Sequence, residues 1–97
     1  MKIKLDNTLK EFMNEKGKKD IVLYADMCNT WGGSFTEVLA RFANEDETLQ
    51  ENEYQEADSE LGKVYLPVRG MKYAETVKFG LIKFLWMSKI TVSGVSL

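Results

Sequence analysis

What most constrains this chain is its lack of side chains that form disulfides or bind metals: its 97 residues contain one cysteine, Cys28, and no histidine. A single thiol excludes an intramolecular disulfide, so the fold must be held together by an apolar core. A chain of this length can bury roughly 65% of its unfolded surface, which suffices for such a core. Without histidine, Ser-His-Asp and Cys-His catalysis and the Cys/His zinc sites are excluded. The length predicts one domain, residues 1–97. No nucleophile is paired with a base, so we do not expect an enzyme.

Charge argues against nucleic acid as the partner. The chain carries 13 Lys and Arg against 15 Asp and Glu, whereas phosphate binding needs a clustered basic face. The stretch 45–60 holds eight acids and no base, and we interpret it as a solvated acidic loop. A cation site is the alternative, although the spacing and the central glycine of a calcium-binding loop are missing from this stretch.

The sequence predicts neither a signal peptide nor a membrane-spanning helix. The first residues carry lysines with no apolar run behind them, so we expect no signal peptide. The most apolar stretch, 77–95, is interrupted by lysines such as Lys83, and a lysine at the centre of a membrane helix costs roughly 3 kcal/mol. We therefore expect no membrane partner. A free thiol suits a reducing compartment, which favours the cytoplasm.

The first half of the chain predicts a helix, a strand and a loop. Apolar residues recur with helical spacing from Leu5 to Met13 and predict a helix over 8–16, which Gly17 ends. The apolar run 21–25 is rich in β-branched residues and predicts a strand buried on both faces. The segment 27–34 is rich in asparagine, threonine, glycine and serine, which predicts a loop.

The segment 35–42 fits two structures. Its apolar residues have helical spacing, and Ser34 with Glu37 forms a capping box, so local preference favours a helix. As a strand, the same segment would line one face with Thr36, Val38, Ala40 and Phe42. The local pattern leaves both structures open.

The second half predicts strands. Residues 63–69 form one, with Pro67 at an edge or a strand end because it cannot donate a hydrogen bond. Residues 71–75 are expected to form a turn, and 76–81 and 90–95 to form two further strands. The apolar link 84–87 between them is expected to be buried.

Four segments carry a resemblance to a known family. They are MKIKLDNTLKEFMNEKG, IVLYADMCNTWGGSF, KVYLPVRGMKY and VKFGLIKFLWMSKITVSG. Together they resemble the HesB/IscA-like proteins of iron–sulfur biogenesis, and more closely their small bacterial relatives with a Cys-Cys or selenocysteine motif. The resemblance implies an α+β fold: a small, β-rich, sandwich-like domain with an N-terminal helix packed against it. It also implies that 35–42 is a strand.

The cysteines of the family are mostly missing. The A-type carriers have a Cys-Gly-Cys near the C-terminus, where this chain has the thiol-free ITVSGVSL of residues 90–97, and Asn29 follows Cys28 in place of a second cysteine. Iron–sulfur clusters are normally held by several thiolates. We therefore expect no cofactor. A cluster or metal ion could be held only if Cys28 of two subunits met across an oligomer interface.

Candidate site residues lie around this cysteine. Cys28 is either a reactive thiol and metal ligand or a small buried apolar residue. Gly32, Gly33 and Ser34 could bind an anion through backbone N–H groups, but hairpin turns use the same residues. Trp31 lies in a glycine-flanked loop where a large ring is hard to bury, and exposed tryptophans are frequent hot spots of interfaces.

The other aromatic residues, Tyr65, Phe84 and Trp86, are expected to fill the core. The sequence thus predicts a non-enzymatic interaction or scaffold domain, with a protein partner or a homodimer as its assembly. The alternative is a thiol-dependent iron–sulfur, metal or redox protein that uses Cys28 across an oligomer interface.

Overall fold

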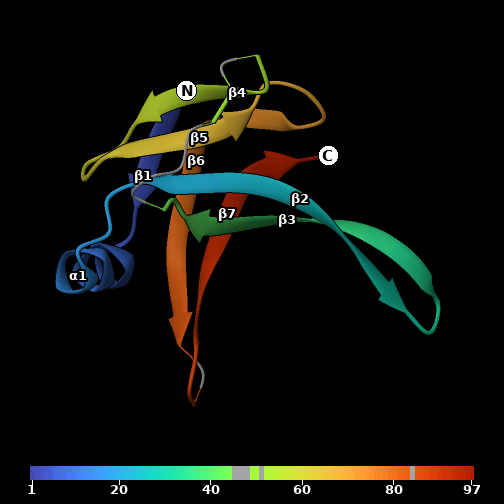
Figure 1. Cartoon of the computed structure of the whole chain (residues 1–97), viewed down its shortest axis with the longest axis horizontal. Coiled ribbons are helices and arrows are strands. Elements are labelled where there is room, and N and C mark those ends of the chain that lie inside the picture. Colours follow the sequence, from blue (N-terminus) through green and yellow to red (C-terminus); the bar gives the residue numbers. More distant parts are fainter. Residues whose placement is uncertain (45–48, 51, 84) are drawn as a thin grey trace.

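Strands dominate the architecture. The computed structural model describes residues 1–44, 49–50, 52–83 and 85–97, and within these ranges it contains two sheets and one helix (Figure 1). The strands are β1 (Lys2–Leu5), β2 (Ile21–Thr30), β3 (Gly33–Phe42), β4 (Tyr54–Asp58), β5 (Lys63–Pro67), β6 (Lys72–Lys83) and β7 (Ser88–Ser96), and the helix is α1 (Asn7–Lys16).

The strands form sheets with the orders β1-β6-β7 and β3-β2-β5-β4 among the described residues. In the first sheet β1 is parallel and β7 antiparallel to β6. In the second, β2 is antiparallel to β3 and parallel to β5, while β4 is antiparallel to β5. Strands β2 and β3 run across β6 and β7 in Figure 1, so the two sheets cross at a steep angle.

The core lies where the sheets cross and is made of apolar side chains from both sheets and from the helix. It contains Leu5, Leu9, Met13, Ile21, Leu23, Val64, Leu66, Val77, Phe79 and Ile90. Phe79 on β6 is the largest of the fully buried side chains among the described residues. This core provides the burial that a chain without disulfides needs.

Helix α1 confirms the predicted helix over 8–16. Asp6 caps its start, because its Oδ1 accepts a hydrogen bond from the N–H of Leu9 at 2.8 Å. Gly17 ends it with φ of 69°, a left-handed conformation that suits glycine. Leu9 and Met13 share one face of the helix and are fully buried.

The predicted α+β fold class is wrong, because the described residues are mostly β and contain only this one short helix. The chain enters the fold as strand β1, not as a helix, and β1 pairs with β6. Lys2 and Lys4 are exposed while Leu5 is buried, so the lysines alternate with inward-facing apolar residues as in a half-buried strand.

Strand β2 starts as predicted and ends later than predicted. Ile21, Val22 and Leu23 are fully buried, which agrees with a strand covered on both faces. The expected loop over 27–34 is wrong, because β2 continues to Thr30 and pairs residue by residue with β3. The strand alternative for 35–42 is correct. Tertiary packing overrides the capping box there, because Val38, Ala40 and Phe42 pack against the core.

The C-terminal half follows the prediction in part. Pro67 is the last residue of β5, and the strands predicted at 76–81 and 90–95 lie within β6 and β7. The predicted turn over 71–75 is largely replaced by strand, because β6 begins at Lys72 and contains an irregularity in its pairing with β7 between Tyr73 and Lys78.

The acidic stretch is not simply a loop. Residues 54–58 form β4, whereas 45–48 and 51 lie outside the described residues. Lys63 on β5 donates from its Nζ to Oδ1 of Asp58 at 2.9 Å, and this hydrogen bond raises the pKa of Lys63. Lys63 and Asp58 thus form an exposed ion pair between the neighbouring strands β5 and β4.

Tyr73 supplies a link between the sheets. Its hydroxyl on β6 donates a hydrogen bond to the carbonyl oxygen of Pro67 at the end of β5, and burial raises the pKa of the hydroxyl above the ordinary tyrosine value. The folded chain holds this proton more tightly than the unfolded chain. The protonated hydroxyl therefore contributes to the free energy of unfolding below the ordinary pKa of about 10, and this contribution is lost as the pH rises through the raised pKa.

We therefore predict that Tyr73→Phe lowers the free energy of unfolding by about 1 kcal/mol near neutral pH. Urea unfolding of both proteins over a pH series that extends past the ordinary tyrosine pKa of about 10 measures this. The difference between them should narrow in the alkaline part of the series. A difference that stays constant across the series would contradict this role of the hydroxyl proton.

Candidate functional site

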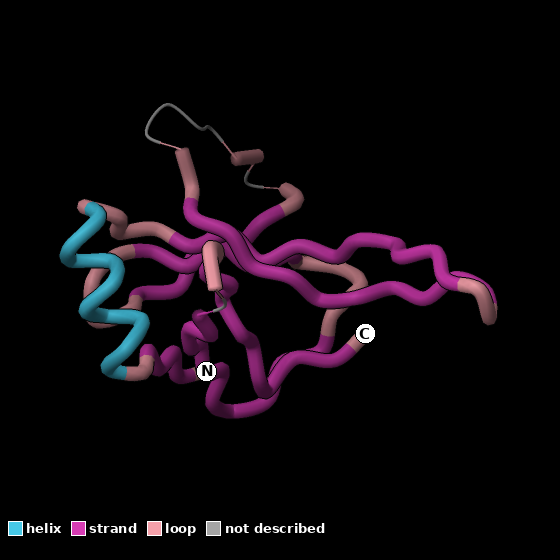
Figure 2. Tube along the Cα trace, turned by 90° about the horizontal axis from the view of Figure 1, so that it is seen from below, coloured by secondary structure: helices cyan, strands magenta, loops and turns pink. Residues whose placement is uncertain are grey.

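The outer half of the β2–β3 hairpin extends away from the rest of the molecule (Figure 2). We call residues 25–38 the arm; its register runs from Ala25 opposite Val38 to Thr30 opposite Gly33. Ala25, Asp26, Met27 and Asn29 are exposed, and so is every residue from Trp31 to Thr36. The arm therefore consists of a two-stranded ribbon, an arrangement that is marginally stable in water without further packing.

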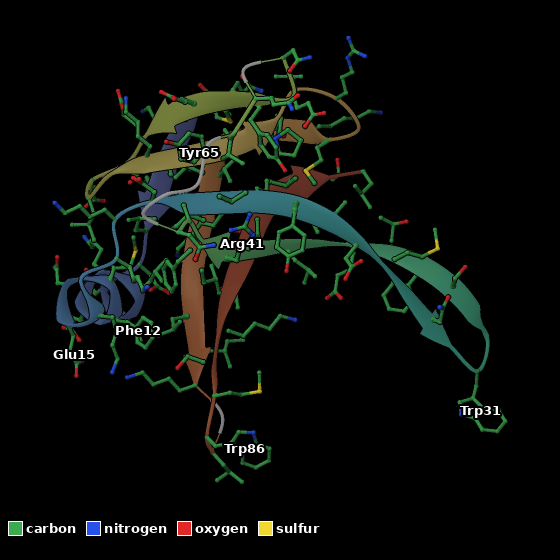
Figure 3. The ribbon with its side chains drawn as sticks, in the orientation of Figure 1. Phe12, Glu15, Trp31, Arg41, Tyr65 and Trp86 are labelled. Carbon is green, nitrogen blue, oxygen red and sulfur yellow. The ribbon has the colours of Figure 1, made fainter. Side chains whose placement is uncertain are left out.

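The tip of the arm is a tight turn at Trp31 and Gly32, followed by Gly33 with φ of 130°. This backbone conformation suits glycine. The hairpin turn predicted for Gly32, Gly33 and Ser34 is therefore correct for Gly32 alone, because Gly33 and Ser34 are the first residues of β3. The anion-binding role of these three residues stays a prediction. The Trp31 side chain is fully exposed at 106% and points away from the hairpin (Figure 3).

Apolar residues continue along the arm beyond the core. Met27 and Phe35 are 65% and 51% exposed, and both lie on strands whose inner halves are packed on the body. Exposed large apolar side chains grouped on one projection are typical of an interaction surface.

The charges on the arm add to its instability. Asp26 and Glu37 are directly opposite each other in the register, which places two like charges on the same face of the ribbon and is unfavourable. Lys89 on β7 lies near this pair, with its Nζ 3.7 Å from Oε1 of Glu37. The arm thus carries an acidic band between its aromatic tip and the body.

Cys28 lies within the arm, not in a loop. Its Cα is opposite that of Phe35, and its neighbours Met27 and Asn29 are exposed. The structure describes the backbone of Cys28 and not its side chain, so both hypotheses for this thiol stay predictions. The hairpin does bring Cys28, Trp31 and residues 32–34, the predicted site residues, onto one projection.

A second exposed tip joins β6 to β7, and the sequence analysis missed it. Leu85 and Trp86 are 95% and 84% exposed, and Ile82 and Met87 are about half-exposed. The predicted burial of 84–87 is therefore wrong for residues 85–87, and Phe84 lies outside the described residues. The signal that could have indicated this tip is the pair Lys83 and Lys89, which bracket the apolar residues as they would at a surface.

The two tryptophans do not form one site. Figure 3 shows Trp31 and Trp86 at the ends of different hairpins, each pointing away from the body, while Tyr65 lies over the sheet that contains β5. Trp86 is thus not the core residue that was expected. Tyr65 is partly buried, and its place on the sheet separates it from both tips.

Among the described residues, no group of three or more His, Cys, Asp and Glu side chains is placed to hold a metal ion. In the same part of the chain, no helix has the length and apolar character needed to cross a membrane.

Comparison with models of protein families gives a match over almost the whole chain. The model of the CC/Se motif containing family matches residues 1–95. This confirms the predicted resemblance to Cys-Cys or selenocysteine relatives, whereas the HesB/IscA part of that prediction finds no support. No curated protein matches the chain, and no solved structure does.

Proposed function

The chain belongs to the CC/Se motif containing family, and we propose that it is a non-enzymatic interaction domain that binds a protein partner or a second copy of itself through the arm. The observation that carries this proposal is the exposure of Met27, Trp31 and Phe35 on a projecting two-stranded ribbon. Tryptophan is among the residues that contribute most to binding in protein interfaces.

The energetics of the arm support a partner. A ribbon with few packing contacts and a like-charged pair, Asp26 opposite Glu37, gains little from its own sequence when it stands in water. Met27 is opposite Thr36 and Phe35 is opposite Cys28, so the two apolar side chains lie on opposite faces of the ribbon. A partner on one face would bury one of them, and a partner that encloses the arm would bury both.

The cysteine content supports a binding role over dithiol chemistry. The family is described by a CC/Se motif, whereas this chain has Asn29 after its only cysteine, Cys28. A dithiol that cycles between reduced and oxidised states needs two sulfur atoms, and one chain supplies one. The absence of histidine from the sequence removes the most frequent general base as well.

A thiol-dependent iron–sulfur, metal or redox protein is the second candidate. It is favoured by the position of Cys28 on the arm, since the same contact that joins two arms would bring two Cys28 residues toward each other. In either case we propose that the chain works in the cytoplasm, where a free thiol stays reduced, and that nucleic acid is not its partner.

The arm is tested by Trp31→Ala and Phe35→Ala. We predict that each weakens self-association, measured by sedimentation velocity over a concentration series, by about tenfold or more. Urea unfolding of each variant should stay close to that of the unmodified chain, because both side chains are exposed. If the unmodified chain stays monomeric, the same variants are compared for loss of partners crosslinked in cells of the source organism.

Trp86→Ala serves as the matched control because it removes the same side chain from the other tip. Assembly that Trp31→Ala leaves unchanged, or that Trp86→Ala reduces equally, would contradict the proposed role of the arm. The second candidate is tested separately by anaerobic addition of iron and sulfide. Visible charge-transfer bands that vanish with Cys28→Ser would favour it, and a colourless protein would count against it.

A further inference from the structure

We propose that the tip between β6 and β7 binds an anionic lipid surface, with its apolar side chains in the interfacial layer and its lysines at the headgroups. We call residues 82–83 and 85–89 the Lys-flanked tip. This function goes beyond the proposed binding by the arm and does not depend on it.

The end of the Lys-flanked tip is formed by large apolar side chains. Leu85 and Trp86 are almost fully exposed, and Ile82 and Met87 are about half-exposed, so several large apolar side chains of the tip face water. Leaving this area in water is unfavourable, and its burial would be favourable. The tip is narrow and projects from the body (Figure 3). A fluid lipid layer can accommodate such a projection without a preformed pocket.

The charge around the tip is positive. Lys83 and Lys89 stand on either side of the apolar residues and both are exposed. From residue 76 to residue 97 the sequence contains three lysines and no acid. Lys89 also lies 3.7 Å from Glu37 on β3, but both of these side chains are about half-exposed. Lysines beside an apolar end are attracted to anionic headgroups.

The residue types of the tip suit the surface of a lipid layer. Tryptophan prefers the boundary between hydrocarbon and water, because its ring is apolar and its N–H can be hydrated there. Lysine side chains next to it can extend their charged ends toward the headgroups. Shallow binding of this kind requires no spanning helix, so the lysines that argue against a spanning helix over 77–95 do not argue against it.

The other tip provides the contrast that selects this one. Trp31 is also fully exposed, but the nearest charges along the arm are the acids Asp26 and Glu37. An anionic surface would repel Asp26 and would find no lysine or arginine within residues 25–38, whereas it would attract Lys83. Glu37 and Lys89 lie 3.7 Å apart and offset each other in part. Of the two exposed tryptophans, only Trp86 is therefore expected to enter an anionic lipid layer.

The test uses the full chain and sucrose-loaded vesicles of either phosphatidylcholine alone or phosphatidylcholine with about one third phosphatidylserine, separated by sedimentation. We expect binding to the anionic vesicles and at least about tenfold weaker binding to the neutral ones. Trp86→Ala should reduce binding to anionic vesicles by about tenfold. The double variant Lys83→Gln with Lys89→Gln should remove most of the preference for anionic vesicles, and high salt should do the same.

Matched variants assign the effect to one tip. Trp31→Ala, compared with the unmodified chain at a concentration where sedimentation velocity shows both to be monomeric, should leave vesicle binding unchanged. Trp31→Phe leaves Trp86 as the only tryptophan, whose fluorescence should shift to shorter wavelength on binding. Urea unfolding of every variant checks that it is folded. Absence of binding to anionic vesicles, equal binding to both compositions, or equal losses from Trp31→Ala and Trp86→Ala would overturn the proposal.

A protein partner for the tip is a further outcome that would overturn it. In that case Trp86→Ala would weaken self-association or a crosslinked complex while vesicles are not bound. The arm is judged by sedimentation velocity without lipid and the tip by vesicle binding, so failure of one proposal does not imply failure of the other.

Discussion

Phe79→Ala is expected to lower the free energy of unfolding by about 4 kcal/mol, the range found when a buried phenylalanine is truncated. The side chain is completely buried between the sheets. On β6 it lies opposite Leu5 of β1 and Val92 of β7, so all three strands of that sheet meet at this position. Removal of the ring leaves a cavity that the surrounding strands can fill only in part.

The size of this loss matters for a chain of this length. A domain of about 100 residues typically has a free energy of unfolding of about 5–15 kcal/mol, so Phe79→Ala removes a large share. The midpoint of urea unfolding measures it, with the slope of the transition as a check that the unfolding reaction is the same. We expect the midpoint to fall strongly or the variant to be unfolded without denaturant.

Phe35→Ala is the matched control, because it removes the same side chain from the arm, where the ring is 51% exposed. We expect a loss within about 1 kcal/mol. Equal losses from the two variants would contradict the assignment of Phe79 to the core and of Phe35 to an interaction surface. The comparison thus tests whether the Phe35 ring contributes to the stability of the fold.

The buried half of β2 could be predicted from sequence, and its outer half could not. The run from Ile21 to Leu23 consists of apolar residues that pack on both faces, and burial leaves this clear pattern in the sequence. Beyond Ala25 the strand leaves the core, so no apolar alternation marks it. There the backbone pairing with β3 maintains the strand, and polar residues are compatible with it.

The segment 35–42 shows the limit of local preference. Ser34 and Glu37 fit a helix start, yet Val38, Ala40 and Phe42 pack on the core as alternate residues of a strand. The choice depended on contacts with residues distant in the sequence, which a local pattern does not contain. The same holds for β1, where four residues are too few for their alternation of lysine and apolar side chains to be decisive.

The sequence predicted the exposure of candidate site residues only where the neighbouring residues in the chain indicate it. Trp31 was expected to be exposed because glycines flank it, and the structure shows it fully exposed. The exposure of Leu85 and Trp86 was not foreseen, because a run of apolar residues is most often buried. Whether such a run lies in the core or at a projecting tip depends on where the hairpin ends relative to the other sheet, which is a property of the whole fold.

Gly94→Ala is expected to destabilise the fold by about 3 kcal/mol, for two reasons that add together. Gly94 on β7 has φ of 85°, where a residue with a Cβ is strained. A Cβ built there would overlap the carbonyl oxygen of Thr76 on β6, so the backbone of the neighbouring strand would have to move. Glycine is needed because the two strands approach closely at the irregularity between Tyr73 and Lys78.

Gly70→Ala separates the two reasons, because Gly70 has the same φ of 85° and open space where a Cβ would be placed. We expect this variant to lose about 1 kcal/mol, the strain alone. Urea unfolding of both variants gives the contribution of close strand approach as their difference, about 2 kcal/mol. Equal losses would mean that β6 moves aside at no cost.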